Sequence, residues 1–181
     1  MLDLGGGSLL SLPDLVADPR VSSWTVVDLV DRLGERPPRV SFVKSDAARF
    51  VADWSGEPFD AVVCFGLLMY LPSDAARGLL DALPRVMKPG AALLSHEPNA
   101  SAAGHLERGL ERTAAEPAEP RGWRVELREA HNHPLLWAAA ARLNAPALWE
   151  GAAGDLLLAA EARLGGGLDD LAVLRPDAAR R

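Results

Sequence analysis

The chain is poor in cysteine, aromatic residues and positive charge, and it lacks a long uninterrupted hydrophobic run. Its single cysteine, Cys64, cannot form an intrachain disulfide and lies in an apolar run, which predicts a buried thiol in a reducing compartment. The 19 basic and 25 acidic residues give a net charge of −6, which argues against a broad nucleic-acid-binding surface. Charged residues and a proline interrupt the most apolar region, 135–160, so no segment is expected to span a membrane. No secretory signal is recognisable, and we expect a soluble cytoplasmic protein.

The first half of the chain has the pattern of an α/β fold. Its 181 residues are 49% hydrophobic and 24% charged, which fits one globular domain over residues 1–181. Short apolar runs alternate with helical stretches, and this alternation predicts a parallel sheet with helices on both faces. Strands are expected at 1–4, 26–27, 40–43, 59–65 and 91–94, and helices at 13–17, 47–54 and 74–86. In the last helix, Ser73 is the expected N-cap, and Pro84 is expected to kink or end the helix.

The second half has a different pattern. A polar helical stretch, 101–116, precedes a Pro-containing linker and an alternating strand at 123–130. Two further helical stretches, 135–143 and 147–164, precede a last apolar strand at 171–174. We therefore divide the domain into a cofactor-binding half, 1–99, and a substrate-side half, 100–181, with a helical insertion at 134–164.

Glycines and acidic residues occupy the ends of the expected strands. Three consecutive glycines follow the first strand, and glycine lets the backbone approach a ligand closely because it has no Cβ. In parallel open sheets, ligands bind beyond the carboxyl ends of the strands, often at a glycine turn before a helix. The later strands end at Asp28, Asp46, Phe65-Gly66 and His96-Glu97. Each aspartate alone is also a common turn residue or helix cap, but the set together predicts a site for a nucleotide-like cofactor.

Over residues 1 to about 99, the chain resembles the class I S-adenosylmethionine-dependent methyltransferases. The segments that carry the resemblance are 2–7 (LDLGGG), 26–30 (VVDLV), 43–47 (VKSDA), 59–65 with 68–72, and the Lys-Pro-Gly turn within 85–90. The resemblance implies a Rossmann-like, mostly parallel sheet of seven strands and S-adenosylmethionine as the cofactor. Its last strand would be antiparallel and inserted between the fifth and sixth.

The resemblance also implies roles for individual residues. The glycine turn would approach the methionine part of the cofactor, Asp28 would bind the ribose, Asp46 would flank the adenine, and Phe65 would lie beside the sulfonium. The full cofactor-binding set expected in this way is Asp3, Gly5, Gly6, Gly7, Asp28, Leu29, Asp46, Ala47, Phe65 and Gly66.

Two features depart from the family pattern. Leu9 stands where a third glycine is frequent. The family also usually has lid helices before the first strand, whereas this sequence starts within that strand. These departures imply a truncated start, a lid supplied by another chain, or weak or lost cofactor binding. We accordingly expect a homo-oligomer or a partner chain that covers the missing lid.

Methyl transfer requires an in-line arrangement of donor and acceptor and, for a hydroxyl or amine acceptor, a general base. The candidates for catalysis are His96, Tyr70 and Glu97, and His96 is preferred because an imidazole titrates near neutrality. Each has a structural alternative: a hydrogen-bonded strand-end histidine, a packing aromatic side chain, and a loop residue held by Pro98.

A metal site is the less favoured interpretation of a histidine-rich segment. On a continued strand, Glu129, His131 and His133 would share one face and could bind zinc. Pro134 follows directly and indicates a strand exit instead, so we expect no metal.

The sequence thus predicts a methyltransferase that acts on a small molecule, at oxygen or nitrogen, such as a phenolic or other secondary metabolite. Trp137 and Trp149 flank the helical insertion, where substrate covers are built in this architecture. The first alternative is a catalytically inactive, methyltransferase-like subunit that needs another chain to complete its site. A nicotinamide-dependent oxidoreductase is disfavoured, because Leu10 replaces the last glycine of the dinucleotide fingerprint. Neither a nucleic acid nor a membrane is expected as a partner.

Overall fold

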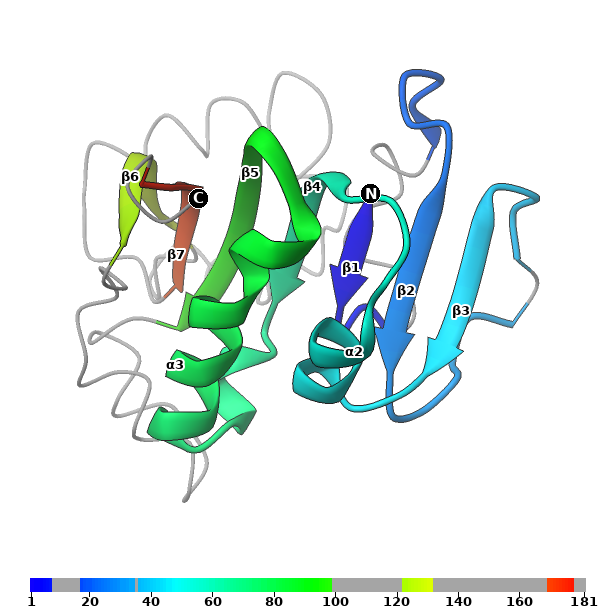
Figure 1. The fold of residues 1–181 in the computed structure, drawn as a ribbon, viewed down its shortest axis with the longest axis horizontal. Helices are drawn as coiled ribbons and strands as arrows, with labels where there is room; N and C mark the ends of the chain where they lie inside the picture. Colours follow the sequence, from blue (N-terminus) through cyan, green and yellow to red (C-terminus); the bar gives the residue numbers. More distant parts are fainter. Residues whose placement is uncertain (8–16, 35, 99–121, 132–168, 178–181) are drawn as a thin grey trace, which may run out of the picture.

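The computed structural model describes residues 1–7, 17–34, 36–98, 122–131 and 169–177. Seven strands in these ranges form one sheet (Figure 1). The strands are β1 (Leu2–Leu4), β2 (Trp24–Asp28), β3 (Val40–Lys44), β4 (Phe59–Phe65), β5 (Met87–Pro98), β6 (Trp123–His131) and β7 (Asp169–Pro176). The helical elements are α2 (Ala47–Asp53), α3 (Ser73–Ala82) and the 3₁₀ turns η1 (Leu68–Tyr70) and η2 (Leu83–Val86). The helices predicted at 101–116, 135–143 and 147–164, and all but the last residue of 13–17, lie outside the described residues.

The order of strands confirms the predicted sheet. It runs β3-β2-β1-β4-β5-β7-β6, and β7 is antiparallel to both of its neighbours. The other pairings along the sheet, from β3 to β5, are parallel. The chain order reverses at β1, which pairs with β2 on one side and β4 on the other. The carboxyl ends of β1 and β4 therefore flank the switch point at which open α/β sheets bind ligands.

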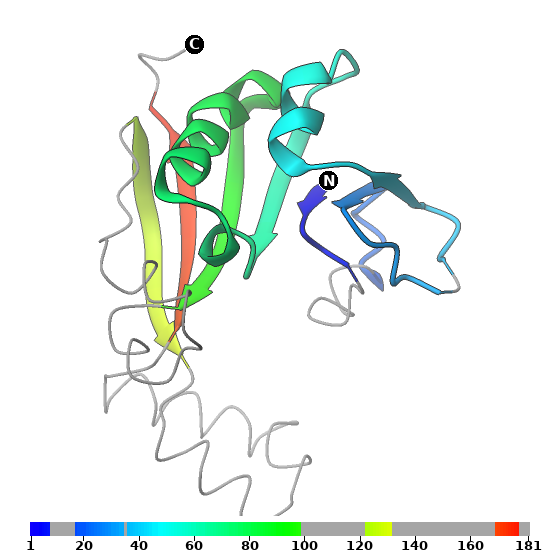
Figure 2. The same cartoon turned by 90° about the horizontal axis from the view of Figure 1, so that it is seen from below.

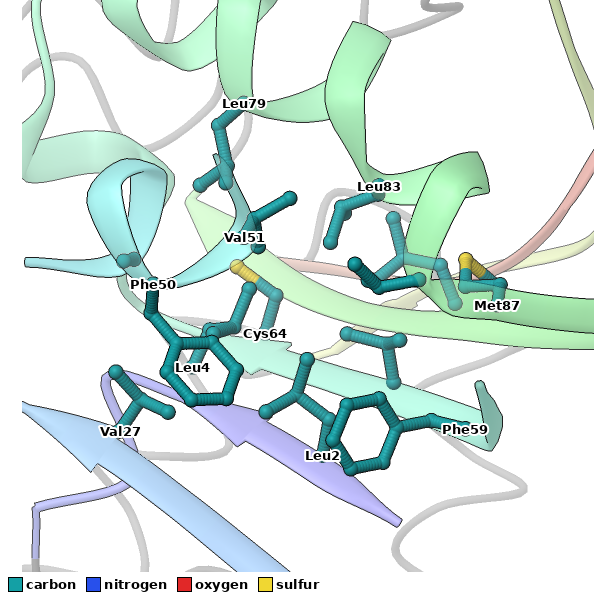
Figure 3. Packing of buried hydrophobic residues seen from close by; sticks show 14 of the residues in the cluster. Leu2, Leu4, Val27, Phe50, Val51, Phe59, Cys64, Leu79, Leu83 and Met87 are labelled. Carbon is teal, nitrogen blue, oxygen red and sulfur yellow. The ribbon is translucent and has the colours of Figure 1, made fainter. Parts of the chain in front are cut away.

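Two apolar clusters form the core, one on each face of the sheet. The larger cluster joins the sheet to α2 and α3, which lie on the same face, in cyan and green (Figure 2). Figure 3 shows side chains of these helices, among them Val51 and Leu79, above Leu4 and Cys64 of the sheet. Because neighbouring residues of a strand point to opposite faces, Val26 and Val63 belong to the second cluster. Burial on both faces explains the continuous apolar run 61–65 in β4.

The two α-helices begin and end for different reasons. Asp46 caps α2, since its Oδ1 accepts a hydrogen bond from the backbone N–H of Arg49 at 2.9 Å. The predicted cap of α3 is wrong by one residue: the N-cap is Pro72, without a side-chain cap, and Ser73 is the first helical residue. The expected break at Pro84 is confirmed, because the α-helix ends at Ala82 and continues as η2.

The Lys-Pro-Gly segment is part of a bulge rather than a turn before the fifth strand. Phe59 pairs with Met87, but Ala61 pairs with Ala92, so extra residues of β5 bulge between these two pairs. Gly90 takes a φ of +82° there. The fifth strand is consequently longer than the predicted 91–94. Among the described residues, no helix combines the length and apolarity that a membrane crossing requires.

Candidate functional site

The glycine turn continues directly from β1. The backbone N–H of Gly5 donates to the carbonyl oxygen of Val27 at 2.8 Å, which carries the β1–β2 pairing one residue further. Gly5 has a φ of +77°, a conformation that residues with a Cβ rarely adopt. A Cβ on Gly5 would also lie 3.1 Å from the Cβ of Leu67, in the loop after β4. Conformation and contact both favour glycine at this position.

Asp3 lies buried beneath the turn. Its side chain is 2% exposed, and a Cβ on Gly6 would come within 2.3–2.4 Å of its carboxyl atoms. Burial raises the pKa of Asp3 to about 7; the indole of Trp24 opposes this shift, and the charge of Asp28 adds to it. Among the described residues, neither Asp3 Oδ2 nor Trp24 Nε1 has a hydrogen-bond partner, although both atoms are buried.

Asp28, at the end of β2, holds the turn through its carboxylate. Oδ2 accepts a hydrogen bond from the N–H of Gly7 at 3.0 Å, and Oδ1 accepts one from the N–H of Val30 at 2.9 Å. A carboxylate has about four acceptor sites, so each oxygen can still accept a hydroxyl donor. The following apolar residue, Leu29, is 62% exposed and Val30 is 49% exposed, which leaves an apolar surface beside the carboxylate.

The end of β3 carries a helix cap. Asp46 uses Oδ1 to cap α2, while its side chain remains exposed. Ala47 is 8% exposed and packs in the larger core cluster, so its methyl group faces the core.

Phe65 and His96 are paired residues at the ends of β4 and β5. Their rings meet edge to face, with centroids 5.5 Å apart and planes at 66°. The N–H of Gly66 donates to the carbonyl oxygen of His96 at 2.8 Å. Gly66 has a φ of +65°, and apart from its chain neighbours no atom of the described residues lies within 4 Å of the place where its Cβ would be. The backbone is therefore open to a ligand beside the Phe65 ring.

The other two catalytic candidates differ sharply in their surroundings. Glu97 binds the loop after β4: its Oε1 accepts from the N–H of Leu68 at 2.9 Å and its Oε2 from the N–H of Met69 at 3.1 Å. Tyr70 lies in η1 and is 67% exposed. The carboxylate of Glu97 thus contacts backbone groups, whereas the ring of Tyr70 is accessible.

Because β1, β2, β4 and β5 are parallel, these residues gather at one edge of the sheet. The structure brings together the glycine turn, Asp28, the Phe65–His96 pair and Glu97. This edge fits a nucleoside cofactor. The carboxylate of Asp28 can accept hydrogen bonds from two hydroxyl groups, the exposed side chains of Leu29 and Val30 adjoin it, and Gly66 leaves space for a ligand beside Phe65. No group of three metal-binding side chains occurs in the described residues. The side chains of Glu129 and His131, and all of His133, lie outside what the structure describes.

Sequence reasoning missed two residues of this site. Leu67 packs on Gly5, and Trp24 faces Asp3. The alternation of strand faces could have indicated Trp24. Asp3 pairs with Val26, and Trp24, two residues before Val26, lies on the same face of the sheet as both. No local pattern marks Leu67, because its contact spans the gap between two loops.

Comparisons with known proteins agree with this architecture. A family model for a methyltransferase domain matches residues 1–90, and no curated protein matches the chain significantly. The chain is similar to the N-methyltransferase NodS from Bradyrhizobium japonicum WM9, with 13% identity and a TM-score of 0.59 over 97% of this chain and 84% of that one. It is also similar to the plantazolicin methyltransferase BpumL, solved with a triazolic substrate analogue and S-adenosylhomocysteine (10% identity, TM-score 0.57, covering 97% and 76%).

A third similar structure comes from the complex between the Haloferax volcanii Trm112 methyltransferase activator and a methyltransferase (17% identity, TM-score 0.60, covering 97% and 81%). The family match covers the glycine turn, Asp28, Asp46 and the loop after β4, and the strand order is the one that the resemblance implied. The chain therefore belongs to the class I S-adenosylmethionine-dependent methyltransferases.

Proposed function

We propose that this protein transfers a methyl group from S-adenosylmethionine to a small-molecule acceptor. The observation that carries the proposal is the double use of Asp28. Its carboxylate fastens the glycine turn through Gly7 while both oxygens keep acceptor capacity toward the edge of the sheet. One residue thereby shapes the loop at the cofactor and offers the ribose its acceptors.

The remaining residues of the site take roles that fit their positions. The backbone of the glycine turn approaches the methionine part of the cofactor, and Leu29 offers its exposed side chain to the adenine. Asp46 contacts the adenine edge with the oxygen that does not cap α2. Phe65 and Gly66 border the methyl group, and His96 accepts the proton of the acceptor.

A small acceptor is favoured over a nucleic acid. The net charge of −6 opposes association with a polyanion. NodS is an N-methyltransferase, and BpumL is a plantazolicin methyltransferase that was solved with a triazolic analogue. Both have the same fold as this chain, which makes a small, partly apolar acceptor our proposal.

The first test is calorimetric titration of the wild type with S-adenosylmethionine and S-adenosylhomocysteine. We expect micromolar binding that Asp28→Ala weakens at least about tenfold, because two charge-assisted acceptors are lost. The matched control is Asp60→Ala, which removes an exposed carboxylate paired with Lys88 at the opposite end of the strands. Equal affinity of Asp28→Ala and the wild type would refute the ribose assignment.

The second test uses a labelled methyl donor with bulk RNA and with a small-molecule extract. We expect label in the extract alone, and at least about 100-fold less of it with His96→Gln, whose S-adenosylhomocysteine affinity should stay within about twofold. Label in RNA alone would contradict the small-molecule acceptor. Retained activity of His96→Gln would remove the general-base role.

The second candidate function is a methyltransferase-like subunit, inactive alone, that needs another chain to complete its site; the similar methyltransferase solved with its activator supports the need for a partner. Exposed apolar side chains at Leu29, Val30, Tyr70 and Leu127 give the described surface groups through which chains could associate. A folded wild type that binds neither cofactor form would favour this candidate. Light scattering over micromolar concentrations tests association, and a monomer throughout would contradict it.

A further inference from the structure

We propose that Glu97 is a positioning residue that holds the loop after β4 against the glycine turn and thereby sets cofactor affinity. The proposal rests on the proposed function, since it concerns the same site. It assigns Glu97 a role through backbone groups rather than the direct catalytic role that its place at a strand end suggests.

The carboxylate of Glu97 binds two backbone N–H groups of the loop after β4. Glu97 is half-buried near the end of β5, and its two oxygens accept hydrogen bonds from the N–H groups of Leu68 and Met69 at 2.9 and 3.1 Å. These donors belong to the first turn of η1, where backbone N–H groups have no partner within the helix. The two bonds are charge-assisted and are made by one rigid group, so they define the position of the loop.

A backbone hydrogen bond next to Glu97 also attaches this loop to β5. The N–H of Gly66 donates to the carbonyl oxygen of His96 at 2.8 Å, one residue before Glu97 in β5. The loop is therefore tied to β5 on both sides of Leu67. With its neighbours fixed, Leu67 has little freedom to move away from the sheet.

Leu67 connects this loop to the glycine turn. The side chain of Leu67 packs against Gly5, where even an added Cβ would approach it to 3.1 Å. A displacement of the loop would thus open the contact that supports the turn. Burial raises the pKa of the Cys64 thiol in β4 well above its ordinary value, and the charges of Glu97 and Asp3 raise it further.

The chain of contacts runs from Glu97 through the loop amides and Leu67 to Gly5. It predicts that loss of the carboxylate loosens the loop and weakens cofactor binding without removing a group that touches the cofactor. Glutamine should replace the function in part, because its single oxygen can accept one N–H while its amide nitrogen faces the other as a second donor. We expect the wild type to bind the cofactor most tightly, Glu97→Gln more weakly and Glu97→Ala most weakly.

The experiment measures the S-adenosylhomocysteine Kd by calorimetry and amide hydrogen exchange of Met69, well below the melting temperature. For Glu97→Ala we expect affinity at least about tenfold weaker and Met69 protection at least about tenfold lower, the factor for losing one charge-assisted hydrogen bond. Glu97→Gln should show smaller losses in both. Leu83→Ala is the matched control: this fully buried residue should lower the melting temperature while affinity stays within about twofold.

Unchanged affinity or unchanged Met69 exchange in Glu97→Ala would overturn the proposal. A loss of affinity in Leu83→Ala as large as that in Glu97→Ala, at matched stability, would overturn it as well. Loss of methyl transfer in Glu97→Gln with unchanged affinity and exchange would instead make Glu97 a catalytic residue. If Glu97→Ala does not fold, unchanged values in Glu97→Gln overturn the proposal by themselves. A wild type that binds no cofactor would refute the proposed function and, with it, the effect of Glu97 on affinity. The exchange of Met69 would still test whether Glu97 holds the loop after β4.

Discussion

The carboxyl group of Asp3 packs directly against Gly6, so that a Cβ at residue 6 would lie 2.3 Å from Oδ2. This contact joins a buried acid to the backbone that approaches the cofactor. Asp3 is 2% exposed and cannot turn into solvent to make room. The path of the glycine turn therefore depends on a side chain that lies beneath it.

We predict that Gly6→Ala destabilises the protein by about 1–3 kcal/mol, because the new methyl group overpacks the site of the Asp3 carboxyl. Urea denaturation measures the change. The matched control is Gly78→Ala in α3. Beyond the backbone of this helix, no atom of the described part of the chain lies within 4 Å of the place where the Gly78 Cβ would be, so the substitution should stabilise by about 0.5–1 kcal/mol. A double variant, Gly6→Ala with Asp3→Ala, should show favourable coupling. Strict additivity would argue against the contact.

Asp3 should make stability depend on pH. Its pKa is about 7 in the folded protein, above the ordinary value of 3.8, so the folded state keeps the proton to higher pH than the unfolded state. The stabilisation from this proton is complete below about pH 4 and is lost as the pH rises to about 7. The wild type should thus lose about 2–3 kcal/mol more than Asp3→Asn between about pH 5 and 8.

The measurement is the free energy of unfolding of both proteins by urea across this pH range. Other titrating groups contribute equally to the two proteins and cancel in the difference. Asp60→Asn, at an exposed aspartate whose pKa Lys88 lowers, should run parallel to the wild type between about pH 5 and 8. A constant difference between the wild type and Asp3→Asn would show that Asp3 is ionised throughout.

Asp46 offers a separation of structural and binding roles. Asp46→Ala should cost about 1 kcal/mol of stability by removing the N-cap of α2, and Asp46→Ser should restore most of it. Both variants lack the second carboxylate oxygen, so both should bind S-adenosylhomocysteine about fivefold more weakly if that oxygen contacts adenine. Thermal unfolding and calorimetry give the two quantities. Full recovery of affinity in Asp46→Ser would restrict Asp46 to the cap.

Much of the fold could be predicted because its signals are local. The run 59–65 forms β4 with the predicted bounds, and Pro84 ends α3 through its missing N–H. The start of α3 was wrong at Ser73, since Pro72 can precede a helix equally well and no side-chain cap forms. The length of β5 was underestimated because Lys88 and Gly90 carry turn signals, yet they lie in a bulge within the strand, between Met87 and Ala92, which both pair with β4.

The sequence by itself determined where the strands lie, which of them end in glycine or a carboxylate, and which family the pattern resembles. These properties depend on periodicity and on residue types a few positions apart. Only the tertiary structure decided what each carboxylate contacts: Asp28 holds Gly7, Asp3 packs under Gly6, and Glu97 binds amides 28 and 29 residues earlier in the chain. A carboxylate accepts hydrogen bonds from any donor within reach, and the folding of distant strands into one edge determines which donors those are.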